Sequence, residues 1–157
     1  MSVATPKNIL GYEWYKLKQI SYSKESIEVN LNLERDRTHN HLCSVCNQKA
    51  SPQRKKDRRV KDLLFHGWKT LVVLEYYEVK CKQCGLRVEH IPFVRPYARA
   101  TKRFEEAVAW LCQHLPLSVV ALYFSLNWKT VTNIDKAYLE YRFEAPSLDN
   151  ITVIRVL

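Results

Sequence analysis

Two Cys-x-x-Cys motifs constrain this chain more than any other feature of its sequence. Thiolates at this spacing are the usual ligands of a tetrahedral structural Zn²⁺, with each motif supplying two sulfurs from one tight turn. The motifs are separated by 34 residues, more than the roughly 15–20 of the simplest zinc ribbons. We therefore predict a structural Zn²⁺ site with an insertion between its two halves, and its ligands are Cys43, Cys46, Cys81 and Cys84.

Other assignments of these residues are open at the level of sequence. The cysteines could form a redox-active pair or stay reduced in the core, and His39 or His41 could replace one of them as a ligand. The fifth cysteine, Cys112, lies on the apolar face of an expected helix and is interpreted as a small buried hydrophobe.

The N-terminal part of the chain has the alternation of half-buried strands. Residues 26–34 place Ile27, Val29, Leu31 and Leu33 on one face, and residues 18–23 are expected to pair with them through a turn. Residues 70–81 form a second strand that runs into the second cysteine pair, and residues 87–94 form a short returning strand.

The periodicity becomes helical after Pro96. Thr101 is expected to cap a first helix that ends at Pro116, a second helix covers residues 118–125, and Asn127 caps a third. The predicted fold class is α+β, an N-terminal zinc ribbon with β-hairpins followed by a three-helix helix-turn-helix domain. The expected divisions are 1–97 for the ribbon, 98–145 for the helices and 146–157 for a strand-like tail.

Charge points to a polyanionic partner. The net charge is +9, and residues 35–110 contain 17 basic and 8 acidic side chains. Such a basic block favours nucleic acid over an anionic membrane. No apolar run approaches the roughly 18–20 residues of a membrane span, and residues 1–10 lack the pattern of a secretory signal. We expect a cytoplasmic, nucleoid-associated protein without membrane contact. The basic run expected to contact phosphates comprises Arg54, Lys55, Lys56, Arg58, Arg59 and Lys61.

Residues 117–136 fit a helix-turn-helix. Val120 and Phe124 face inward from its first helix, and Ser125 stands in the turn where glycine is often found. The third helix then presents hydrogen-bonding and basic side chains suited to base edges and phosphates in a major groove. The predicted DNA contacts are Asn127, Trp128, Lys129, Thr130, Thr132, Asn133 and Lys136.

The order of these motifs resembles the N-terminal half of transposases of the ISL3 family. The residues that carry the resemblance are the cysteine pairs, the segments 59–63, 88–92 and 101–104, and the segments from Val120-Ala121 to Thr130-Val131. The resemblance implies a zinc ribbon and a helix-turn-helix that bind double-stranded DNA at the terminal inverted repeats of an insertion sequence. It also implies, as further partners, a full-length transposase or a second copy in a homodimer.

In this family a DDE catalytic domain follows, opening with an Ile-Asp-Glu strand. Here residues 151–157 read Ile-Thr-Val-Ile-Arg-Val-Leu, so we expect a truncated transposase that binds DNA but is not an enzyme. Two alternatives remain. One is a transcriptional regulator that uses the same modules at a promoter. The other is an RNA-binding or protein-interaction ribbon in which Trp14, Trp68 and Trp128 stack on bases or anchor a partner.

Overall fold

A computed structural model describes residues 10–143 of the chain. These residues fall into two compact units, 10–104 and 105–143. The strand-like tail predicted for residues 146–157 lies outside the described part.

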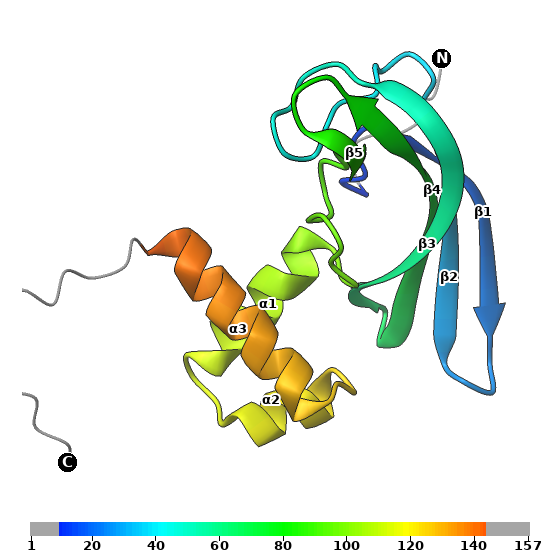
Figure 1. Cartoon of the computed structure of the whole chain (residues 1–157). Helices are drawn as coiled ribbons and strands as arrows, with labels where there is room; N and C mark the ends of the chain where they lie inside the picture. The colour runs from blue at the N-terminus through cyan, green and yellow to red at the C-terminus, as the bar shows by residue number, and fades with distance from the viewer. Residues whose placement is uncertain (1–9, 144–157) are drawn as a thin grey trace, which may run out of the picture. The chain divides into compact units, whose positions relative to one another are not determined.

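The first unit is a five-stranded sheet (Figure 1). Its strands are β1 (Tyr15–Ser23), β2 (Glu28–Arg35), β3 (Ser51–Phe65), β4 (Trp68–Cys81) and β5 (Gly85–Val88). The order is β1-β2-β4-β3, and β5 pairs with the end of β4. The predicted pairing of residues 18–23 with the strand that follows is confirmed by the antiparallel β1–β2 ladder. Strands β2 and β4 are parallel. Parallel strands need a long crossover connection, and here the first cysteine pair and β3 provide it between the end of β2 and the start of β4.

The insertion expected between the cysteine pairs is a β-hairpin. Strands β3 and β4 are long, bent and antiparallel, and they run beside each other along most of their length (Figure 1). The basic run 54–61 therefore lies in the middle of an edge strand. Sequence patterning missed this strand because charged residues occupy both of its faces, so it shows no apolar alternation.

The core of the first unit covers one face of the sheet. Val29, Leu31 and Leu33 of β2 are buried there, as their alternation predicted, and Val72 and Leu74 of β4 are fully buried beside them. The segments that flank the sheet complete this core with Tyr12, Tyr15, Ile91 and Val94. Ile27, which the pattern had included, is 54% exposed and has a positive φ of 50° in the turn before β2.

The helices are α1 (Lys102–Cys112), α2 (Leu117–Tyr123) and α3 (Trp128–Arg142). Both predicted caps are formed. Phe104 N donates to Thr101 Oγ1 at 3.3 Å, and Lys129 N donates to Asn127 Oδ1 at 2.9 Å. Ser125 has a φ of 50°, so it takes the left-handed conformation for which glycine is usually chosen in this turn.

The second unit buries apolar side chains from both helices of the helix-turn-helix, including Val120 and Phe124, which were predicted to face inward. Val120 and Phe124 of the first half and Val131 and Ile134 of α3 are each at most 8% exposed. Tyr141, near the C-terminal end of α3, is 86% exposed. None of the three helices has the length and hydropathy that a membrane crossing requires.

Candidate metal centre and nucleic-acid interface

The four predicted metal ligands lie together. All four sulfurs are within 4.8 Å of one another, and Cys46 Sγ is 3.5 Å from Cys81 Sγ. A tetrahedral ion with metal–sulfur bonds of about 2.3 Å requires sulfurs about 3.8 Å apart. None of the four forms a disulfide. The cluster therefore has the size and donor chemistry of a closed, four-thiolate metal site.

Backbone geometry explains why these two turns can present their sulfurs to one ion. The residue after each pair, Asn47 (φ 55°) and Gly85 (φ 72°), takes a left-handed conformation that folds the chain back over the cysteines. The first turn closes with Cys43 N donating to Gln48 O at 2.9 Å, and the second is the β4–β5 hairpin. Ser44 N donates to Val88 O at 3.2 Å, so the two turns are joined by their backbones.

The electrostatics of the cluster favour a bound cation. The N–H groups of Cys84 and Gln83 lower the pKa of the Cys81 thiol to about 7, which stabilises its thiolate. The pKa of the Cys84 thiol is raised to about 12, first by the neighbouring Cys46 sulfur, then by burial, and then by the sulfurs of Cys43 and Cys81. Four thiols this close oppose one another's ionisation, and a divalent cation at their centre removes that opposition.

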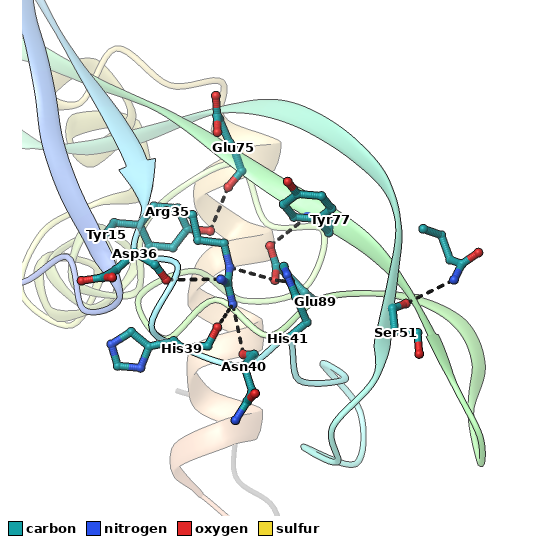
Figure 2. Close-up of polar contacts among 11 residues, drawn as sticks. Tyr15, Arg35, Asp36, His39, Asn40, His41, Ser51, Glu75, Tyr77 and Glu89 are labelled. Atoms are coloured by element: carbon teal, nitrogen blue, oxygen red, sulfur yellow. Dashed lines mark hydrogen bonds and ion pairs between the residues drawn. The ribbon is translucent and has the colours of Figure 1, made fainter.

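A buried carboxylate holds the first cysteine turn against the sheet. Glu89 is 2% exposed, and its carboxylate accepts hydrogen bonds from Arg35 Nε at 3.2 Å and Tyr77 N at 2.8 Å (Figure 2). His41 Nδ1 lies 2.7 Å from the same carboxylate. Figure 2 also shows the Arg35 guanidinium against the carbonyl oxygens that precede the turn, those of Asp36, His39 and Asn40. Every buried side-chain polar atom of this network has a partner, as a buried ion pair requires.

A second buried carboxylate connects β3 to the start of α1. Asp62 is 2% exposed and accepts hydrogen bonds from Thr101 Oγ1 and Arg103 Nε, both at 2.7 Å. Arg103 Nη2 and the Tyr12 hydroxyl donate to its other oxygen. Burial opposes ionisation of Asp62, but the hydrogen bonds from Arg103, Tyr12 and Thr101 and from the Leu63 N–H outweigh it and lower its pKa. Burial and the Asp62 carboxylate raise the pKa of Tyr12.

Four residues of the two networks lie in segments that carried the family resemblance in the sequence. Asp62 lies in segment 59–63, Glu89 in segment 88–92, and Thr101 and Arg103 in segment 101–104. The structure gives these motif residues interior contacts. Arg35 and Tyr12 were missed, since an arginine at a strand end and a tyrosine in an aromatic segment carry no local signal of burial.

The basic run does not form one uniform surface. Lys56 and Arg58 point toward the core side of the sheet, where Lys56 pairs with Glu78 and Arg58 donates to the carbonyl of Ala98. Lys55 and Arg59 point to the other side, which is exposed. Lys55 pairs there with Glu75 at 2.7 Å. Arg54 and Arg59 are exposed, and their side chains have no ion pair or hydrogen bond to any residue between 10 and 143.

The predicted contact residues of the third helix are on the surface. Trp128 is 58% exposed, Thr132 is half-buried, and the others are exposed. Lys129 Nζ lies 5.8 Å from the centroid of the Trp128 ring, and Thr132 Oγ1 donates back to Trp128 O at 3.0 Å. The start of α3 is therefore a capped helix end with polar and basic groups directed into solvent.

This geometry defines a class of protein: a β-ribbon with a four-cysteine cluster, followed by a helix-turn-helix. Residues 89–139 match the family model of the helix-turn-helix domain of transposase family ISL3. The chain is also similar to the transposase for insertion sequence element IS1001 of Bordetella parapertussis, with 30% identity over 112 residues, or 70% of this chain. The predicted resemblance to ISL3-family transposases is confirmed by both matches.

The coverage of that relative is partial. The aligned region makes up 28% of the IS1001 transposase, so this chain corresponds to a little over a quarter of it. No solved structure matches the chain.

Proposed function

We propose that this chain is a zinc-stabilised, sequence-specific DNA-binding part of a transposase. The observation that carries the proposal is the exposed polar face at the start of α3, within the segment that matches the helix-turn-helix of ISL3 transposases. A helix of this kind enters the major groove with its N-terminal residues against the base edges. The double-stranded DNA proposed as its partner is the terminal inverted repeat of an insertion sequence.

Side chains on α3 have different roles in this proposal. Asn133 and Thr130 read base edges, as amide and hydroxyl groups do through paired donors and acceptors. Lys129 and Lys136 contact phosphates that flank the site, and Trp128 packs its exposed ring against the sugar–phosphate backbone. Asn127 contributes through its cap, which fixes the position of the first turn.

The zinc ion is proposed to be structural. Four thiolates fill its tetrahedral coordination and leave no open position for a substrate or water. It is held by Cys43 and Cys81, which are nearly inaccessible to solvent, and by Cys46 and Cys84, which are partly buried. A second copy of the chain, or a full-length transposase, is proposed as the protein partner at paired transposon ends.

Selection of binding sites from a random duplex library tests the function, followed by affinity measurements on the selected site and on random duplex. We expect Asn133→Ala to weaken the selected site by roughly 1–3 kcal/mol while changing random binding little. Gln113→Ala, an exposed amide outside the helix-turn-helix, is the matched control and should change neither affinity. Failure to select any sequence, or equal loss on both duplexes with Asn133→Ala, would contradict the assignment of α3 as the reading helix.

A further inference from the structure

A pocket opens beside the zinc-binding turns. Its volume is about 630 Å³, and it is formed by the segment before Cys43, the segment after Cys46, the start of β3 and the second cysteine turn. Its wall carries three exposed cationic side chains, Arg37, Lys49 and Lys82. No acidic residue lines it.

The nearby acidic groups are already engaged. Asp36 pairs with Lys16 at 3.1 Å and accepts hydrogen bonds from Thr38, which help lower its pKa to about 2. Glu89 is buried under Arg35 and His41. Within residues 10–143, none of the three cations of the wall has an ion pair or hydrogen bond from its side chain. Their charges face solvent in a concave site, where the field of like charges is concentrated.

The wall also supplies neutral hydrogen-bond donors. Asn40, Gln48 and Gln83, which carry side-chain amides, line the pocket together with the cations. Cations interspersed with amides are the groups that proteins direct at phosphate oxygens of DNA. Ser51 and Pro52, which begin β3, form part of the same wall, so the pocket is continuous with the strand that carries the unpaired Arg54.

We propose that this pocket binds backbone phosphates of duplex DNA, so that the metal ribbon contributes contacts of its own. The inference rests on the proposed function, because it assigns a second contact on the same DNA. Phosphate contacts at the pocket carry no sequence information. They set register and general affinity while α3 selects the sequence.

Neutralisation of the metal centre does not account for these cations. A Zn²⁺ with four thiolates has a formal charge of −2, and N–H donors to Cys81 already disperse part of it. Three cations on the wall exceed that charge, and Lys80 lies next to the second turn in addition. Arg37 also lies outside both cysteine motifs. The charge that remains is available to an external anion.

The test compares two double variants that remove the same charge. The pocket pair, Lys49→Gln with Lys82→Gln, removes two cations of the pocket wall. The control pair, Lys18→Gln with Lys24→Gln, removes two exposed lysines from β1 and the turn after it, at the opposite edge of the sheet. Binding to a random-sequence duplex of about 30 base pairs is measured by fluorescence anisotropy between about 50 and 200 mM salt. Zinc content is measured for every protein, and Arg37→Gln tests the pocket without altering a cysteine turn.

We expect the pocket pair to reduce the slope of log affinity against log salt by about 0.9 for each lysine, and the control pair to leave the slope near that of the wild type. Arg37→Gln should reduce it by about 0.9 with zinc content unchanged. Equal slopes for the two pairs, or no effect of Arg37→Gln in a zinc-replete protein, would overturn the proposal that the pocket binds phosphates. Either result would leave α3 as the binding element. Absence of duplex binding by the wild type would overturn the proposed function as well, before any variant is compared.

Discussion

The sheet unit and the helical unit are stabilised by different kinds of interaction. In residues 10–104, two buried carboxylates, Asp62 and Glu89, each have several charged or polar partners, and four cysteines converge on one point. In residues 105–143 the core consists mainly of apolar side chains such as Val120, Val131 and Ile134, while large apolar side chains remain on the surface. Buried polar networks and a four-cysteine cluster thus add to the apolar core of the first unit, whereas the second unit depends mainly on apolar helix packing. Perturbations should therefore affect one unit while leaving the other folded.

Metal removal should have the largest effect. In small zinc domains the apparent metal-binding free energy, about 10–16 kcal/mol at pH 7, is largely folding free energy. Chelation, or Cys81→Ser, should unfold the cysteine turns and the strands that meet there, while helical signal from residues 102–142 persists in part. Far-ultraviolet circular dichroism and amide-resolved NMR separate the two contributions.

Cys112→Ser is the matched control for that experiment, since Cys112 lies outside the cluster and is only half-buried. It should retain one equivalent of zinc and the wild-type spectrum. Elemental analysis that finds no zinc in wild-type protein purified under reducing conditions would refute the metal assignment.

Breaking one buried ion pair should have the next largest effect. Asp62→Asn leaves Arg103 and the Tyr12 hydroxyl without their anionic acceptor. Loss of a buried pair costs about 3–5 kcal/mol, and the lower end is expected here because the Arg103 side chain is 39% exposed. Chemical denaturation of the zinc-bound protein measures the change.

Asp57→Asn makes the same chemical change on the same strand at an exposed position. It should alter the free energy of unfolding by less than about 0.5 kcal/mol. Similar losses for both variants would show that the charge of β3, rather than the Asp62 network, is responsible.

The sequence predicted the parts of the molecule whose signal is local. Cysteine spacing indicated the cluster, alternation indicated β2 and β4, and the caps Thr101 and Asn127 indicated the starts of α1 and α3. In each case, residues within a few positions of one another determine the structure.

The parts that could not be predicted depend on contacts over long sequence distances. The partners of Asp62 include Tyr12 and Arg103, 50 and 41 residues away. A parallel β2–β4 pair and a strand with charged residues on both faces likewise have no local signature. The pocket is formed from three separate segments of the chain, so only the folded chain brings its cations together.

In the helical unit, the cap of α3 should contribute about 1 kcal/mol. Asn127→Ala removes the acceptor of the Lys129 N–H, at a typical cost of about 0.5–2 kcal/mol. Asn127→Ser keeps a capping oxygen and should restore most of the stability. Thermal unfolding followed by helical signal gives the difference, and zinc content should be unchanged in both. If Ser and Ala destabilise equally, the side chain of Asn127 acts through something other than its cap.

The smallest expected effect distinguishes the two sides of β3. Arg59 is exposed and its side chain has no ion pair or hydrogen bond within residues 10–143, whereas the side chain of Arg58, one position earlier, donates to the carbonyl of Ala98. If the exposed side of the strand contacts phosphates, Arg59→Gln should reduce the slope of log affinity against log salt by about 0.9. Across a fourfold change in salt, the ratio of variant to wild-type affinity then changes roughly threefold. Arg58→Gln removes the same charge but points the other way, so it should lower the free energy of unfolding by about 1 kcal/mol and leave the slope unchanged. Anisotropy titrations and denaturation curves on both variants give the four values needed. If Arg58→Gln changes the salt slope as much as Arg59→Gln does, DNA binding depends only on the total charge of the strand. The orientation of its side chains then does not determine the contact.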